Sequence, residues 1–223
     1  MPAANTTYHS LLYRHFKEIA ADNFRQIIRF CEDNEHKIRY LEFEEYFDFR
    51  VAYVNALFEI GAYKKHLLFV DAVIEMVISH NIQVYNGQDI YRDMLFRKAA
   101  SLYNLYDFDK CVYILRQLIR IDPEDKYAVQ LLTVCLRRQS TFLLRLSRAL
   151  AILLFLATAV IIFIEVMAVR PFFDRYTTDI ELLRNLGFVS GLLVLGLGFL
   201  YHRLQADYHV SHFVACVKSE KGC

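Results

Sequence analysis

The sequence predicts an all-α protein, in which an array of helical hairpins is followed by a transmembrane helical hairpin. Three observations predict it. Glycine and proline are scarce, with 7 and 3 among 223 residues, so little interrupts a helical hydrogen-bond ladder. Apolar residues recur at helical spacing through residues 1–140, without the sustained alternation that is typical of a β-strand. Two long apolar runs then follow within residues 141–206.

The first 140 residues are expected to form a series of helices separated by turn-favouring residues. Gly61 can end a helix with a positive φ, and Asn86-Gly87 is a turn dipeptide. Pro123 suits the first turn of a helix, with Asp122 as its N-cap. Since no glycine or proline follows before the first apolar run, we expect the last helix to continue directly into that run. The expected helices are 7–19, 22–34, 38–59, 63–81, 88–104, 108–120 and 124–145.

Residues 92–125 carry the pattern of a repeated helical hairpin. The turn Asp107-Phe108-Asp109-Lys110-Cys111 leads into a second helix, and Asp122-Pro123 closes the unit. This segment resembles one 34-residue tetratricopeptide repeat (TPR), although Lys98 stands where that family usually has leucine. The resemblance places eight residues in the packing of the repeat: Leu95, Ala99, Leu102, Phe108, Cys111, Leu115, Leu118 and Pro123.

Two further segments resemble the repeat more weakly. Residues 47–80 carry Gly61 and Val70 at corresponding positions, but His66 replaces the small residue and no Asp-Pro follows. Residues 8–34 could form another degenerate hairpin. The resemblance therefore implies an α-solenoid of TPR-like hairpins, which stack because one amphipathic hairpin cannot bury its apolar face alone. Arrays of this kind are usually protein-binding modules.

Charge divides the chain at about residue 140. Residues 1–140 hold 18 of the 26 Lys and Arg and 19 of the 25 Asp and Glu, which leaves 8 and 6 for the remainder. We therefore expect a soluble domain over 1–140, two transmembrane helices within 141–206 and a cytoplasmic tail over 207–223. The soluble part lacks the clustered basic excess of nucleic-acid-binding proteins, so no nucleic-acid partner is expected.

Both apolar runs are expected to cross a lipid bilayer. The first, 149–169, has 21 residues and would extend about 31 Å as a helix. The second, 183–203, has a shorter uncharged core that the flanking arginines could extend by snorkelling. Thr178 and Glu181 form a capping-box pattern before it. The alternative is a re-entrant second segment.

Basic residues flank the outer ends of the two runs. Four arginines precede the first run, and three basic residues follow the uncharged core of the second run, residues 186–201. Between the first run and that core stand Arg170, Arg175 and Arg184. Because cytoplasmic flanks carry the excess of Lys and Arg, both termini are expected in the cytoplasm, with the protein an integral membrane protein of two spans.

Four glycines and one acid within the apolar runs are candidates for a membrane function. Gly187 and Gly191 form a GxxxG pattern, and Gly196 and Gly198 follow. This face could pack against the first run of the same chain or form a homo-oligomer. Glu165 interrupts the first run, where it could reach the membrane interface or take part in proton or ion coupling.

Two polar clusters outside the runs are candidates for binding. His209 and His212 could share a helix face and hold a metal, but no further motif supports it, and neutral interfacial histidines are expected instead. Acidic residues gather among aromatic ones over 41–49, either as a solvated helix face or as a patch for a basic partner segment. The residues of this acidic patch are Glu42, Glu44, Glu45 and Asp48.

No catalytic motif is present, so neither an enzyme nor a cofactor is expected. The five cysteines are scattered and form no CxxC pair, which predicts free thiols in a reducing compartment. The sequence therefore predicts a membrane-anchored adaptor or scaffold whose TPR-like domain recruits a protein partner at the cytoplasmic face. The alternative is a subunit of an oligomeric pore, transporter or effector complex, in which the transmembrane hairpin is active and the helical domain senses or gates.

Overall fold

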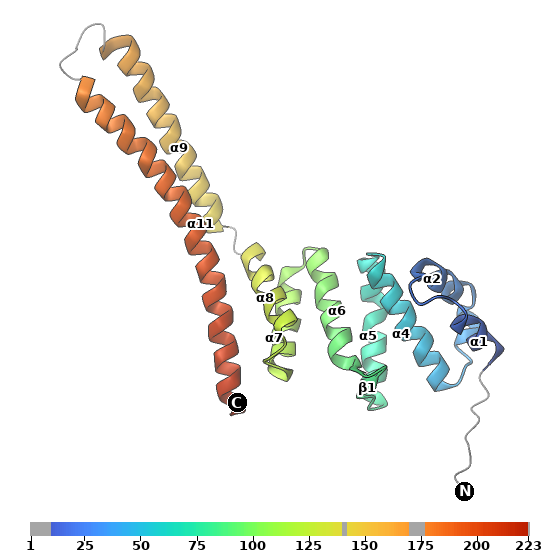
Figure 1. Ribbon diagram of the computed structural model, residues 1–223. Coiled ribbons are helices and arrows are strands. Elements are labelled where there is room, and N and C mark those ends of the chain that lie inside the picture. Colours follow the sequence, from blue (N-terminus) through green and yellow to red (C-terminus); the bar gives the residue numbers. More distant parts are fainter. Residues whose placement is uncertain (1–9, 140–141, 170–176, 223) are drawn as a thin grey trace. The chain divides into compact units, whose positions relative to one another are not determined.

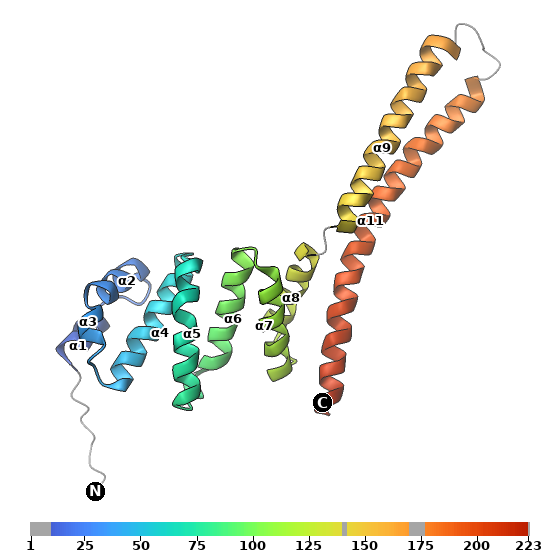
Figure 2. The same cartoon turned by 180° about the vertical axis from the view of Figure 1, so that it is seen from behind.

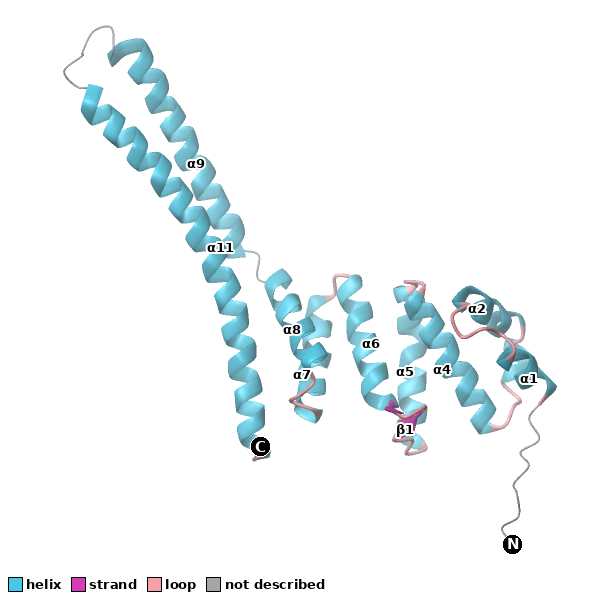
Figure 3. Cartoon of the chain, viewed as in Figure 1, coloured by secondary structure: helices cyan, strands magenta, loops and turns pink. Residues whose placement is uncertain are grey.

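The structure, a computed structural model, describes residues 10–139, 142–169 and 177–222. Contacts divide the chain into two compact units, residues 1–128 and 129–223 (Figure 1). Helices make up nearly all of the regular structure (Figure 3), which confirms the predicted all-α class. One exception is a two-residue antiparallel ladder, in which Val84 pairs with Asp89 and Tyr85 with Gln88.

The first unit is a row of helices that pack in chain order. α2 packs against α4, α4 against α5, α5 against α6 and α6 against α7. Figures 1 and 2 show the row from opposite sides. Its elements are α1 (Leu11–Lys17), α2 (Phe24–Asp33), α3 (Glu35–Ile38), α4 (Phe43–Glu59), α5 (Tyr63–Ser79), β1 (Val84–Tyr85), β2 (Gln88–Asp89), α6 (Ile90–Asn104) and α7 (Phe108–Ile121). The division between the two units falls within the next helix, α8 (Lys126–Gln139).

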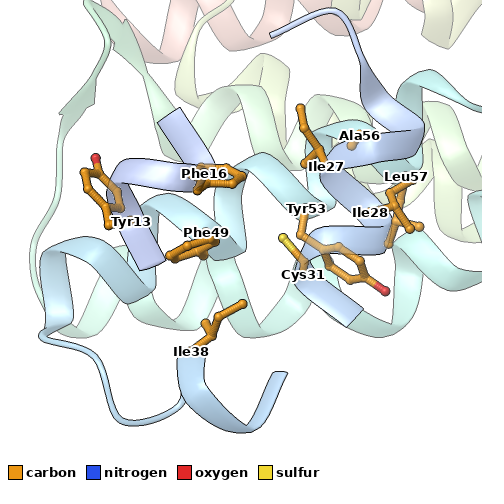
Figure 4. Close-up of a cluster of buried hydrophobic side chains, with 10 residues drawn as sticks. All are labelled: Tyr13, Phe16, Ile27, Ile28, Cys31, Ile38, Phe49, Tyr53, Ala56 and Leu57. Atoms are coloured by element: carbon orange, nitrogen blue, oxygen red, sulfur yellow. The ribbon is translucent and has the colours of Figure 1, made fainter. Parts of the chain in front are cut away.

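Aromatic side chains hold the first helices of the row together. The rings of Phe16 and Phe49 lie 4.3 Å apart between centroids, and Phe30 stacks on Phe49 at 6.1 Å. Figure 4 shows Phe16 of α1 and Phe49 of α4 in one cluster with Ile38. Burial of this apolar surface fixes the short helix α1 onto α4, although seven residues would not form a stable helix alone.

The predicted helix 38–59 begins later than expected, and this prediction was wrong at its N-terminal end. α3 ends at Ile38, and α4 begins only at Phe43. In a continuous helix Ile38 and Phe49 would lie about 16 Å apart along the axis, whereas both side chains are buried in the same cluster. The turn between α3 and α4 therefore forms because it brings Ile38 back onto Phe49.

The two predicted glycine turns are confirmed. Gly61 has φ +77 after α4, and the amide of Ala62 donates to the carbonyl of Leu57 at 2.9 Å, which is the hydrogen bond of a Schellman cap. Asn86 and Gly87 both have positive φ, at 51 and 80. Positive values at both central residues define the type I′ turn of a two-residue hairpin, so the dipeptide closes the small ladder between β1 and β2.

Residues 92–125 lie in a helical hairpin formed by α6 and α7. Asp107 caps α7 by accepting a hydrogen bond from the amide of Lys110, and Tyr106 turns the chain with φ 63. Of the eight expected packing residues, two are half-buried, namely Leu95 and Phe108. The other six are buried: Ala99, Leu102, Cys111, Leu115, Leu118 and Pro123.

Replacing Cys111 with phenylalanine should destabilise this hairpin by roughly 1–3 kcal/mol, because Cys111 is fully buried and a larger side chain overpacks the site. Cys111→Ala should be milder, and Lys110→Phe should change little because the side chain of Lys110 is exposed. Chemical denaturation followed by circular dichroism measures the difference. Equal tolerance of phenylalanine at both positions would contradict the packing.

The start of α8 corrects another expectation. Asp122 does not cap this helix, because its carboxylate accepts from the amide of Glu124 at 2.9 Å within the turn after α7. Asp125 is the cap, accepting from the amides of Tyr127 and Ala128 at 3.0 and 3.1 Å. The predicted continuation of this helix into the first apolar run lies at residues 140–141, which are outside the described residues.

The second unit contains two long apolar helices that pack together. α9 (Phe142–Ile164) continues into a π-helical turn, η1 (Glu165–Val169), and α11 spans Thr177–Lys221. Within the described residues, Leu144–Met167 and Thr178–Lys221 are long and apolar enough to cross a membrane. Only 17% and 6% of their most apolar windows are buried, whereas the core helix of a soluble protein would be mostly buried.

α11 is longer than the predicted second span. It already begins at Thr177, so Thr178 lies inside the helix and is not its cap. It also continues without a break through residues 207–221. This segment was expected to be a tail, and the sequence predicted no secondary structure for it.

Candidate functional site

The first unit carries two neighbouring hollows, one apolar and one acidic, and α6 lines both. Together they are called the groove, with an apolar half and an acidic half. The apolar half, with a volume of about 440 Å³, lies between α1, α2, α4, the β1–β2 turn and α6. Within it the side-chain oxygen Oδ1 of Asn55 is buried and has no hydrogen-bond partner in the part of the chain that the structure describes. The apolar lining consists of Phe16, Ile19, Ala21, Phe24, Ile27, Val51, Ala52, Ala56 and Tyr85.

The acidic half, with a volume of about 750 Å³, lies between α6 and the turn that leads into α8. Its charged lining comprises the four acids Asp89, Asp93, Glu124 and Asp125 and the two bases Arg92 and Lys126. Phe96 and Tyr127 add aromatic rings, and Tyr127 is 76% exposed.

One face of α6 joins the two halves. Asp89, Arg92, Asp93, Phe96 and Arg97 recur at spacings of three and four residues, which places them on a single stripe of the helix. The β1–β2 turn aligns this stripe, because Asp89 ends β2 and caps α6 by accepting from the amide of Arg92 at 3.0 Å.

Arg97 is held at the boundary between the halves. Its Nε donates to Asp93 at 3.0 Å, and its Nη1 donates to Glu59 of α4 at 3.0 Å. Its guanidinium also lies 5.1 Å from the ring centroid of Phe58. These contacts tie α6 to α4 across the floor of the groove and neutralise the arginine.

The predicted acidic patch is divided by the fold. Glu42 and Glu44 remain exposed, but Glu45 is buried and accepts from the amide and hydroxyl of Ser10 at 2.7 and 2.6 Å. Asp48 accepts from Lys17 at 3.0 Å. Two of the four acids therefore bind α1 to α4, which leaves two of them available to a partner.

Asp48 also anchors two tyrosines. It accepts hydrogen bonds from the hydroxyls of Tyr13 and, at 2.8 Å, Tyr85. Burial acts to raise the pKa of Asp48, but the hydrogen bonds from Tyr13, Tyr85 and Lys17 outweigh it and lower the pKa below its usual value. Burial and the bond to Asp48 raise the pKa of Tyr85. The network fixes Tyr85 at the edge of the apolar half.

His66 occupies the centre of the α5–α6 contact. It is fully buried, and its Nδ1 lies 2.9 Å from the hydroxyl of Ser101, whereas its Nε2 has no hydrogen-bond partner within residues 10–139, 142–169 and 177–222. Burial, with a further contribution from the nearby positive charge of Arg97, lowers the pKa of His66 to about 4. The side chain is therefore neutral at pH 7.

In the second unit, three of the four predicted glycines face α9. A Cβ atom at Gly187 would lie 2.5 Å from Thr158, one at Gly191 would lie 2.8 Å from Phe155, and one at Gly198 would lie 2.5 Å from Ser147. At Gly196 a Cβ would meet no atom of the described residues within 4 Å. The close approach of α11 to α9 therefore depends on three glycines, and Gly196 lies on another face.

Replacing Gly191 with leucine should force α9 and α11 apart at a cost of roughly 1–3 kcal/mol, because Phe155 occupies the space of the new side chain. Gly196→Leu is the matched control and should not weaken the hairpin. The measurement is fluorescence energy transfer between labels at Leu150→Cys and Tyr201→Cys, in a protein without other cysteines. It follows the separation of α9 from α11 as SDS is added. Equal SDS midpoints for the two leucine variants would show that the glycine contacts are unimportant.

The predicted acid Glu165 has a partner on the other helix. Its carboxylate is fully buried and accepts from Nη1 of Arg184 on α11 at 3.0 Å. Glu165 is also the first residue of the π-helical turn η1. The pair joins the two helices at the end nearest residues 170–176.

The histidines after the second apolar run lie on an exposed part of α11. The ring of Tyr208 lies 6.3 Å from that of His209 and 6.1 Å from that of His212, and Cys216 Sγ is 3.7 Å from His212 Nδ1. Among the described residues, no group of three or more His, Cys, Asp or Glu is placed to hold a metal ion.

Comparison with known proteins identified no relative, because no protein-family model, curated protein or solved structure matches the chain.

Sequence reasoning missed most of the groove. Asn55, Tyr85 and Arg97 were not singled out, although the spacing from Asp89 to Arg97 is a helical stripe that could have been noticed. Asn55 carried no such signal, because its exposure to the groove depends on how α1, α2 and α6 pack around α4.

Proposed function

We propose that this protein is a membrane-anchored adaptor whose groove binds a protein partner and whose two apolar helices hold it in a bilayer. The observation that carries the proposal is the groove itself, which combines apolar lining, an unsatisfied amide oxygen at Asn55 and a charged half along α6. Such a surface suits a peptide segment, and membrane anchoring would raise the effective concentration of the partner at the bilayer.

The arrangement of helices supports a TPR-like array. α4 and α6 both line the groove, whereas α5, which lies between them in the chain, contributes no lining residue among those described. Alternate helices lining one face are expected when helical hairpins stack side by side. The burial of Ala99, Cys111 and Leu115 at expected packing positions further supports a TPR-like unit at 92–125.

The second unit supports the role of an anchor. Its exposed apolar surface needs a lipid-like environment, and Gly187, Gly191 and Gly198 are already used in packing within the chain. The excess of basic residues outside the two apolar runs supports cytoplasmic termini, and therefore a groove on the cytoplasmic side.

Crosslinking and pull-down of the full chain from its native membranes tests the adaptor function. We expect Asn55→Arg to abolish the capture of a partner, because a long charged side chain would fill the apolar half of the groove. Leu68→Arg is the matched control, since Leu68 is 76% exposed on α5, away from the groove. Capture that is identical for both variants, or the absence of any recurrent partner, would refute the proposal.

Single-cysteine labelling with a membrane-impermeant reagent tests the topology. In intact cells, a cysteine introduced at position 174 should react, whereas cysteines at positions 5 and 219 should be protected until the membrane is permeabilised. Labelling of either terminal site in intact cells would reverse the proposed orientation.

A further inference from the structure

We propose that the groove recognises a peptide segment of the partner that has an uncharged apolar half and a basic half. This inference rests on the proposed adaptor function and specifies the chemistry of its partner. It is drawn from the difference in charge between the two halves of the groove, which α6 joins into one surface.

The apolar half offers no charge for a partner to neutralise. Lys17 is paired with Asp48 at 3.0 Å, and Arg97 is paired with Glu59 and Asp93 at 3.0 Å each. A charged side chain placed there would lose its hydration without gaining an ionic partner. The segment bound above α1, α2 and α4 is therefore apolar.

Asn55 adds a polar requirement to the apolar half. Its buried Oδ1 has no hydrogen-bond partner among the described residues, and an unsatisfied buried oxygen costs free energy that a bound donor would recover. A backbone N–H of a peptide supplies such a donor at any residue type except proline. This feature favours a peptide over a purely hydrocarbon ligand.

The acidic half selects for positive charge. Its four acids and two bases leave a formal charge of −2. The N-termini of α6 and α8 beside it contribute roughly half a positive charge each, which leaves the hollow negative. Phe96 and the exposed Tyr127 can also contact the stems and charged groups of lysine or arginine.

Direct binding to synthetic peptides tests the inference. The probe is a fluorescent peptide with an alanine- and leucine-rich half followed by a run of lysines, and its comparison has glutamates in place of the lysines. The full-length protein is embedded in neutral phosphatidylcholine nanodiscs, and empty nanodiscs give the blank. We expect the lysine peptide to bind at least tenfold more tightly than the glutamate peptide, with a preference that weakens as salt is added.

Two variants locate the binding. The double variant Asp89→Asn/Glu124→Gln should weaken the lysine peptide roughly fivefold, since it removes two charges while asparagine preserves the cap of α6. The matched control, Asp33→Asn/Glu75→Gln, removes two exposed charges outside the groove and should leave binding unchanged. Asn55→Leu should weaken the lysine peptide severalfold.

Equal binding of the two peptides, equal effects of the two double variants, or no binding to the protein beyond empty nanodiscs would each overturn the inference. The adaptor function would survive any of these results if Asn55→Arg still abolished partner capture from native membranes. Loss of that groove dependence would refute the adaptor function itself.

Discussion

Replacing Glu165 with alanine should destabilise the α9–α11 hairpin by roughly 3–5 kcal/mol. The cost arises because Glu165 is fully buried and its removal leaves the charge of Arg184, whose side chain is 28% exposed, without the carboxylate that it contacts at 3.0 Å. The SDS midpoint of the energy-transfer signal between Leu150→Cys and Tyr201→Cys should fall accordingly.

A double replacement separates the loss of the pair from a loss of packing. Glu165→Leu/Arg184→Leu removes both charges and should recover most of the stability, because burying no charge costs less than burying one alone. The exchanged pair Glu165→Arg/Arg184→Glu should recover it partly. An unchanged midpoint for Glu165→Ala, or a double leucine variant as unstable as the single one, would show that the ion pair does not hold the hairpin.

Acidification should destabilise the first unit through His66. Burial and the charge of Arg97 lower the pKa of His66 to about 4 from an ordinary value of 6.5, so the unfolded chain takes up the proton more readily than the folded one. The stability that the neutral form of His66 contributes to the folded state is therefore fully present above pH 6.5. It is lost progressively as the pH falls to about 4. At about 1.4 kcal/mol per pH unit the total loss is roughly 3 kcal/mol.

Urea unfolding of the full chain in detergent, followed by circular dichroism between pH 7 and 4, measures this loss. His66→Gln is the comparison, because it removes the titrating group. Carboxylates with lowered pKa, such as Asp48, also lose stability in acid, so the informative quantity is the difference between the wild type and the variant. A difference that stays constant from pH 6.5 to 4 would contradict the assignment to His66.

The features that the sequence predicted correctly depend on short stretches of chain. Gly61 and Asn86-Gly87 adopt their turns because glycine and asparagine tolerate positive φ wherever they stand. The α6–α7 hairpin follows from local helical periodicity and the cap at Asp107. The two apolar runs are long enough to be recognised without any knowledge of their neighbours.

The errors lie where distant residues compete with local signals. The pattern over 38–59 is helical throughout, yet the contact of Ile38 with the cluster around Phe49 requires a turn. Asp122 and Asp125 are both suitable caps, and only the path of the chain after α7 selects Asp125.

The sequence by itself determined that the protein is helical, where two of its turns lie, and that two of its helices are apolar enough for a membrane. These properties follow from backbone preference, periodicity and hydrophobicity, which act over a few residues. Only the tertiary structure decided that Glu45 would accept hydrogen bonds from Ser10, 35 residues away, and that three of the four predicted glycines of α11 would face α9. It also decided that Asn55 would line the groove. Such outcomes depend on which surfaces meet, because burial and electrostatic pairing act between side chains that the sequence separates.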